Sequence, residues 1–373
     1  MDFLLASVGT AAQHLPCAIW RIPKFAGVQV SFAMSFLAVL IALIIEQARP
    51  LARGNWIHAG FRALARWAAR NLDAGQSHHG WVAWTVAVGL PSAVTVLVHF
   101  ALWAVNPLLA FVWSVGILYV TLGFRQFSHH FTGIRDALED GDEDSAREQL
   151  ATWQQVNAGD LPRSEIIRHV IEYSVLAAHR HVFGVLGWFS ILAALGLGPA
   201  GAVMYRMSEF VGRYWVHKSK TLSAAGEGAS PALQHAATQA WGVIDFLPAR
   251  VTALGFAVVG SFEDAIDAWR SYTQRPEKLS VGAMANRNDG IVLAATSGAM
   301  NVRLGGRALH ATVDAVNASG VLEGDGGPEM AALPMPGREP DLAHLRSVVG
   351  LVWRSVVLWM VLLALLTLAK LLG

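Results

Sequence analysis

The chain has 373 residues, of which 54% are hydrophobic and only 15% are charged. Soluble globular domains average about 25% charged residues, so this composition is typical of a membrane protein. The net charge of +1 gives no field that would select nucleic acid as a partner. The single cysteine, Cys17, excludes an internal disulfide framework and a multi-cysteine zinc site.

Residues 1–33 form a poorly defined N-terminal extension. Its basic residues Arg21 and Lys24 follow the first apolar run, which is the wrong order for a signal peptide. The apolar run that begins at Met34 reaches about twenty residues, enough to cross a bilayer, only together with the eight residues before it. We expect Met34 to be the natural start and the upstream residues to be an over-extended gene prediction.

Residues 34–124 are predicted to form the first membrane unit. After the apolar run, residues 51–80 place arginines beside apolar side chains at helical spacing, which favours a basic interfacial helix. An ordinary helix packed on its own domain explains this pattern equally well. Residues 81–105 and 108–124 are free of charge and are joined by an Asn-Pro turn, so they predict a transmembrane hairpin. The flanking basic residues place the polar helical segment 125–180 in the cytoplasm.

The remainder alternates apolar and polar segments. Residues 181–207 are long enough to span, with a Gly-Pro interruption that allows a broken or re-entrant helix. Residues 208–317 are helical, residues 318–346 are a linker rich in Gly, Ala and Pro, and residues 347–373 form a C-terminal span. The sequence therefore predicts an all-α, polytopic helical membrane protein with additional helical extramembrane segments, located in the bacterial inner (plasma) membrane with the lipid bilayer as a partner.

Four stretches occur in the order of motifs found in one known family. They are ALEDGDEDSAREQL, GPAGAVMYRMSEFVGRYW, DFLPARVTALGFAVVG and NDGIVLAATSGAMNVRLGG. In this order they resemble the CobD/CbiB family of cobalamin-biosynthesis membrane proteins. The chain is also similar to AmpE, an inner-membrane protein, through its early span ending in IEQARP, the hairpin, HRHVFGVLGWF and the closing span. The resemblance covers roughly residues 34–310 and the C-terminal helix.

The two resemblances imply different functions, and both remain open. CobD/CbiB proteins imply an ATP- and Mg²⁺-dependent ligase that joins an aminopropanol, or its phosphate, to the carboxylate of adenosylcobyric acid. AmpE implies a non-catalytic regulatory or sensory protein linked to β-lactamase and cell-wall signalling, which uses a small ligand or a regulatory partner. Retention of PARVTA and VRLGG favours the ligase. Glu172 matches a family glutamate, but the Asn-Thr and Asp-Gly pairs expected after it have no counterparts, which favours the second function.

The CobD/CbiB resemblance also implies the candidate site residues. The candidate catalytic residues are Glu172 and Glu209, and the candidate substrate-binding residues in the matched motifs are Arg206, Asp245, Arg250 and Arg303. A guanidinium at position 250 suits a phosphate or carboxylate. The alternative is an internal pair of Asp245 with Arg250 that fixes the turn around Pro248. Arg303 precedes two glycines whose N–H groups could face an anion, although no P-loop pattern is present.

Histidines at two membrane boundaries complete the set of candidates. His129 and its neighbour at position 130 point about 100° apart on a helix, so we predict no metal site there. Arg125, His129 and Arg135 are candidate donors to an anionic substrate, the alternative being an ordinary polar boundary. His179 shares a helical face with Glu172 and is also a candidate for substrate binding. The competing interpretation is an interfacial anchor, with Arg180 facing lipid headgroups.

Overall fold

The computed structural model describes residues 26–49, 56–154, 158–222, 229–274, 283–306 and 335–372. Within these ranges the chain is almost entirely helical, and the only β-type pairing is one isolated bridge. The predicted all-α fold class is therefore confirmed. Most of the N-terminal extension and most of the predicted linker lie outside the described residues.

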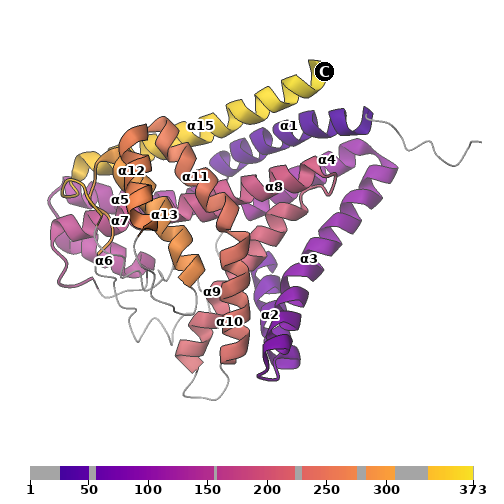
Figure 1. Ribbon diagram of the computed structural model, residues 1–373, viewed down its shortest axis with the longest axis horizontal. Coiled ribbons are helices and arrows are strands. Elements are labelled where there is room, and N and C mark those ends of the chain that lie inside the picture. Colours follow the sequence, from indigo (N-terminus) through magenta and orange to yellow (C-terminus); the bar gives the residue numbers. More distant parts are fainter. Residues whose placement is uncertain are drawn as a thin grey trace, which may run out of the picture.

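The helices are labelled as in Figure 1. In chain order they are α1 (Ala26–Ala48), α2 (Trp56–Leu72), α3 (Ser77–Val105), α4 (Pro107–Thr121), α5 (Phe124–Glu139), α6 (Glu143–Gln154), α7 (Arg163–Ala178), the π-helical turn η1 (His179–Phe183), α8 (Gly184–Ala194), α9 (Ala200–Leu222), α10 (Pro231–Ile244), α11 (Phe246–Val259), α12 (Phe262–Thr273), α13 (Ala283–Met300) and α15 (Leu342–Leu372).

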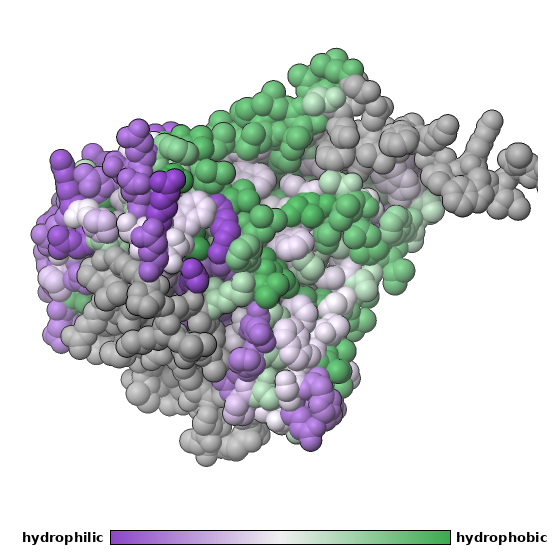
Figure 2. Space-filling view, in the orientation of Figure 1, coloured by the Kyte–Doolittle hydropathy of each residue, from purple (hydrophilic) through white to green (hydrophobic). Residues whose placement is uncertain are grey.

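An apolar belt makes this a multi-pass membrane protein. Among the described residues, three helices are long and apolar enough to cross a bilayer: Ser77–Val105, Arg163–Ala194 and Leu342–Ala369. α10 and α11 make a fourth if the pair, bent by 43°, is one span. Figure 2 shows hydrophobic side chains gathered along α15 and α11 and over the end of the molecule formed by α3 and α4. Hydrophilic side chains gather at the opposite end, around α5, α6 and α12.

The helix from Arg163 to Ala194 differs most from the sequence expectation. It continues from α7 through η1 into α8, so the predicted boundary between residues 180 and 181 falls inside it. The polar first half was assigned to the cytoplasmic segment because it contains charged residues. In the structure Arg168, Glu172 and Arg180 are buried, and they pair with each other and with neighbouring helices. A hydropathy average counts a charged residue as polar even where the folded protein pairs that charge internally.

The predicted Gly-Pro interruption is confirmed as a turn between α8 and α9. Gly196 and Gly198 adopt φ angles of 80° and 58°, the left-handed conformation that only glycine adopts readily. The chain then returns along α8 as α9, which continues without a break past residue 207. α9 also packs against α3 and α10 (Figure 1).

The contact between α8 and α9 is close enough to require glycine at one position. A Cβ atom placed on Gly184 would lie 2.0 Å from Cζ of Tyr205. Tyr205 is fully buried, and its hydroxyl donates a hydrogen bond to Asp245 at the start of α11. Gly184 therefore lets α9 bring a polar group to the junction of α10 and α11.

We expect Gly184→Val to lower the free energy of unfolding by about 1–3 kcal/mol, the usual cost of overpacking a core. The Tyr205 ring would have to move, and its bond to Asp245 would be lost. The midpoint of thermal unfolding in detergent micelles measures the effect. Gly116→Val on α4 is the control because a Cβ there meets nothing within 4 Å. Equal shifts for the two variants would contradict the argument.

Candidate functional site

The candidate site is a set of buried polar groups centred on α7 and η1. An unpaired charge inside a membrane-spanning helix is costly, so such residues are expected to have partners or functions. Here the partners come from α9, α10, α11, α13 and residues 301–306. These elements include most of the sequence motifs singled out above.

Glu172 joins α7 to the segment that follows α13. Its carboxylate accepts hydrogen bonds from Arg168, at 3.0 and 3.2 Å, and from the backbone N–H of Gly305 at 2.7 Å. Arg168 also donates to Glu165, and Gly306 lies beside its guanidinium. Gly305 has a φ of 77°, which turns its N–H toward the carboxylate without steric cost. Glu172 is thus bonded to the backbone of the VRLGG element, at Gly305, and not to the side chain of Arg303.

His179 lies in the centre of the buried network. Its Nδ1 atom is 2.9 Å from the Thr252 hydroxyl, and its Nε2 atom is 3.0 Å from Oδ1 of Asp245. In the tautomer with the proton on Nε2, His179 donates to the Asp245 oxygen and its Nδ1 accepts from the Thr252 hydroxyl. Tyr205 donates a second hydrogen bond, of 2.8 Å, to the same Asp245 oxygen. Burial raises the pKa of the Tyr205 phenol well above its ordinary value, and the Asp245 carboxylate raises it further, so this hydroxyl keeps its proton.

A second buried pair lies beside the first. Arg180 donates to Asp289 of α13 at 2.6 Å, and both side chains are almost completely buried. The expectation that Arg180 faces lipid headgroups is therefore wrong. Burial raises the pKa of Asp289 despite the opposing charge of Arg180, and the negative charge of Asp245 raises it further. One oxygen of Asp245 and one of Asp289 are buried without a hydrogen-bond partner in the described structure.

Glu209 lies one turn beyond Tyr205 on α9 and is also buried. One of its oxygens accepts from Arg206 and the other from Arg213, both at 2.8 Å. The two predicted site residues Glu209 and Arg206 are thus ion-paired with each other. Because the carboxylate is engaged on both sides, it orients these two arginines and is poorly placed to accept a proton from a substrate.

Arg250 does not pair with Asp245, so the predicted alternative of an internal Asp–Arg turn is wrong. Its guanidinium stacks on the Phe246 ring, and its Nη1 atom donates to the Phe246 carbonyl at 2.7 Å and to Oδ1 of Asn288 at 3.2 Å. Asn288 in turn donates to the carbonyl of Gly242. Arg250 is half-buried, so its other N–H groups can reach a bound anion.

The other predicted residues lie apart from this network. Arg303 is exposed, and its backbone N–H donates to the carbonyl of Arg338. His129 is exposed on α5, where Arg135 pairs with Asp136 at 2.7 Å. The side chain of Arg125 lies outside the described residues. In the described structure, no hydrogen bond or ion pair links His129 or Arg135 to the buried network.

The described residues contain no group of three or more His, Cys, Asp or Glu side chains arranged to hold a metal ion. Sequence reasoning also missed Thr252 and Asp289. The signal for Asp289 was present as a lone carboxylate at the start of the apolar run GIVLAATSGAM, where a charge needs a partner. Thr252, inside PARVTA, carried no such signal because threonine is common in apolar helices.

The family model described as CobD/Cbib protein matches residues 35–325. The chain belongs to the CobD/CbiB family. The matched range includes every residue of the buried network, from Arg168 to Gly305, and excludes α15. The second resemblance, to AmpE, is not favoured because the family match and the curated relatives agree on CobD.

Two CobD relatives illustrate the match. A protein named cobalamin biosynthesis protein CobD from Chromobacterium violaceum is 32% identical over 212 residues, which cover 56% of this chain and 61% of the relative. A protein of the same name from Stutzerimonas stutzeri is 28% identical over 343 residues, covering 88% of this chain and 96% of the relative. No solved structure matches the chain.

We expect Arg180→Ala to cost about 3–5 kcal/mol of unfolding free energy, because it leaves the Asp289 carboxylate buried without its partner. Adding Asp289→Ala should recover part of this loss, since the isolated charge is then gone. Denaturation monitored by tryptophan fluorescence in detergent measures both variants. Arg270→Ala is the control because its pair with Asp267 is exposed, and such pairs contribute about 0–1 kcal/mol. An Arg180→Ala variant as stable as the control would contradict the role of the buried pair.

Proposed function

We propose that this CobD/CbiB protein is an inner-membrane ligase that forms an amide between an aminopropanol, or its phosphate, and the carboxylate of adenosylcobyric acid. The observation that carries the proposal is the convergence of the family-like motifs. Residues of η1, α9, α11 and α13 that are far apart in sequence meet in buried polar groups around His179 and Arg180. Arginines at its edge are available to anionic substrates.

Amide formation needs an activated carboxyl group and an amine that has lost its proton. We propose that ATP activates the carboxylate by phosphoryl transfer. The amine nitrogen then forms the C–N bond, the C–O bond to phosphate breaks, and a base takes the amine proton. The corrinoid carboxylate, the phosphate of an aminopropanol phosphate and the phosphorylated intermediate all carry anionic groups, so the cations at the edge of the network are the groups expected to bind them.

Arg250 is the strongest candidate for substrate binding. Two acceptors, the Phe246 carbonyl and Asn288, fix one nitrogen of its guanidinium, and the Phe246 ring supports its face. A guanidinium held in this way is oriented before an anion arrives, which reduces the entropy lost on binding. We propose that its remaining N–H groups bind the phosphate of the aminopropanol substrate or the carboxylate of the corrinoid. Arg303, exposed beside Gly305 and Gly306, is a second candidate.

Glu172 and Glu209 are better explained as positioning residues than as catalytic bases. Each carboxylate has both oxygens engaged by arginines, or by an arginine and a backbone N–H. Glu172 fixes the Gly305 segment against α7, and Glu209 orients Arg206 and Arg213. We propose that their contribution to activity is indirect, through the cations and backbone that they hold.

The requirement for ATP and Mg²⁺ is part of the proposal, but we assign no residue to the metal. A nucleotide-bound Mg²⁺ usually takes one or two protein carboxylates and keeps several waters. Asp245 and Asp289 each have an oxygen without a partner, but both are buried among helices and do not fit a nucleotide-bound metal in this arrangement.

Complementation of a strain that lacks adenosylcobinamide-phosphate synthase tests the function. We expect the wild-type chain to restore cobalamin-dependent growth on cobyric acid, and Arg250→Ala to abolish or slow it. Loss of a charged hydrogen bond costs about 1.5–3 kcal/mol, so kcat/KM should fall roughly ten- to a hundredfold. Arg250→Lys should retain part of the activity, and Arg270→Ala, on the exposed surface of α12, should match the wild type. No growth from a membrane-inserted wild-type chain would refute the proposed reaction.

The Glu172→Gln variant tests whether Glu172 acts by positioning its neighbours or by contacting the substrate. A glutamine can still accept from Gly305, but its amide group cannot neutralise Arg168. We expect growth and the amount of folded, membrane-inserted protein to fall together for Glu172→Gln. For Arg250→Ala we expect growth to fall while the amount of protein is maintained. Immunoblotting of membrane fractions, with detergent size exclusion, gives the second measurement. Normal protein with no growth for Glu172→Gln would instead indicate direct participation in the reaction.

A further inference from the structure

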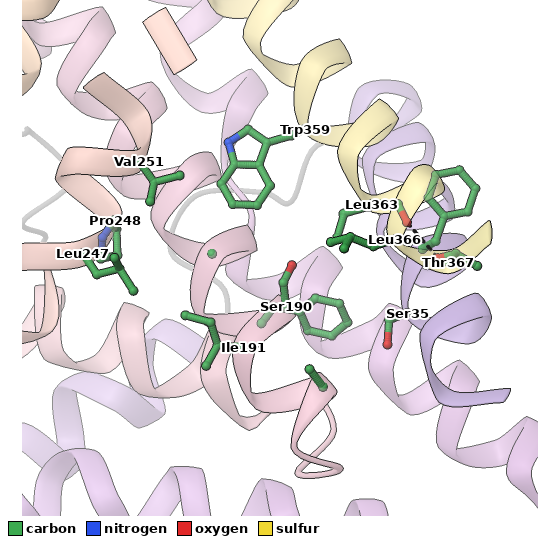
Figure 3. A pocket seen from close by; sticks show the side chains of 14 residues that line it. Ser35, Ser190, Ile191, Leu247, Pro248, Val251, Trp359, Leu363, Leu366 and Thr367 are labelled. Carbon is green, nitrogen blue, oxygen red and sulfur yellow. Dashed lines mark hydrogen bonds between the residues drawn. The ribbon is translucent and has the colours of Figure 1, made fainter. Parts of the chain in front are cut away.

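A pocket of about 340 Å³ opens between α1, α8, α11 and α15, away from the polar network. This volume is within the ~300–1,000 Å³ range of ligand-binding pockets. Figure 3 shows its walls: side chains from α11 and α15 face each other across the opening, and α8 forms the floor between them. The principal lining residues are Ile191, Leu247, Pro248, Val251, Trp359 and Leu363.

The side chains that line the pocket favour a hydrocarbon ligand. The named lining side chains are aliphatic or aromatic. The hydroxyls of Ser190 and Thr367 also line the pocket, but each donates to a backbone carbonyl of its own helix, at 2.7 and 2.8 Å. These hydroxyls are therefore engaged within the protein, and a charged or strongly polar ligand would lose hydration without recovering hydrogen bonds from them.

The position of the pocket identifies the source of that hydrocarbon. Leu247 and Val251 on one side and Leu366 on the other are exposed at the opening. They continue into the apolar outer surface of α11 and of α15, the helix that runs across the membrane (Figure 2). The opening is thus continuous with the surface that faces the bilayer, where acyl chains are the most abundant hydrocarbon.

We propose that this pocket binds one acyl chain of a membrane phospholipid, held between α11 and α15 as an integral lipid rather than as part of the general lipid shell. The chain packs against one side of α11, while Thr252, on another side of the same helix, bonds to His179. The lipid therefore stabilises the placement of α11 and, through it, the buried network. This inference does not depend on the proposed ligase activity.

Photo-crosslinking in proteoliposomes tests the proposal. The full chain is reconstituted with a phosphatidylethanolamine that carries a diazirine in one acyl chain, and labelled residues are located by mass spectrometry after irradiation. We expect adducts on pocket residues such as Leu363 to saturate at low probe fraction. Adducts on Leu97 of α3, an exposed residue in another spanning helix, should rise in proportion to the probe. The proposal would be overturned if labelling of the pocket residues rose in proportion to the probe, as labelling of Leu97 does.

Filling the pocket provides the matched comparison. Gly187 lines it, and a Cβ atom there meets nothing within 4 Å, so Gly187→Leu can occupy the space without a backbone clash. Gly116→Leu on α4 is the control, because its Cβ is equally unobstructed and lies outside the pocket. We expect about a tenfold fall in pocket labelling for Gly187→Leu, equivalent to roughly 1.4 kcal/mol of binding, and no change for Gly116→Leu. Undiminished labelling in Gly187→Leu would refute the acyl-chain site.

Discussion

The structure depends on one constraint: the charges on the membrane-spanning helix from Arg163 to Ala194 must be neutralised inside the protein. Moving an ion from water into a low-dielectric interior costs several kcal/mol even after relaxation, and the cost is recovered only by close, well-oriented partners. Arg168, Glu172 and Arg180 lie at intervals of four and eight residues along this helix and have such partners. Each helix that supplies a partner must therefore have a fixed position along the Arg163–Ala194 helix and a fixed rotation about its own axis. The architecture of the central part of the molecule follows from this requirement.

Apolar and polar contacts determine different aspects of the fold. α1, α4, α8 and α15 pack largely through aliphatic side chains, which tolerate sliding and rotation. The hydrogen bonds of His179, Arg180 and Glu172 have narrow distance and angle limits, so they set the register of α11, of α13 and of the segment that follows α13. Buried pairs of this kind contribute little net stability compared with apolar replacements. Their retention here is consistent with a site that needs its elements held in one arrangement.

The sequence predicted features that depend on neighbouring residues, such as apolar spans and turns. It did not predict contacts between residues that are far apart in the chain. Uninterrupted apolar runs predicted the spans that became α3 and α15, and glycines with proline predicted the turn between α8 and α9. The burial of this part of the long helix was missed because His179, Arg180 and Glu172 have partners 66, 109 and 133 positions away. Periodicity contains no information about such contacts. For the same reason Asp245 was matched with nearby Arg250, when its partners are His179 and Tyr205.

The π-helical turn η1 fixes the number of residues that this part of the long helix can contain. A π turn closes an i→i+5 hydrogen bond, so it holds one more residue than an α turn. Here the extra residue lets His179 reach α11 while the adjacent Arg180 reaches α13. Deletion of one residue in this turn would rotate α8 by about 100° relative to α7, and would break the bond from Trp188 to the Ile244 carbonyl at the end of α10. A one-residue change in the length of this segment would therefore disturb the packing more than most exchanges among its apolar side chains.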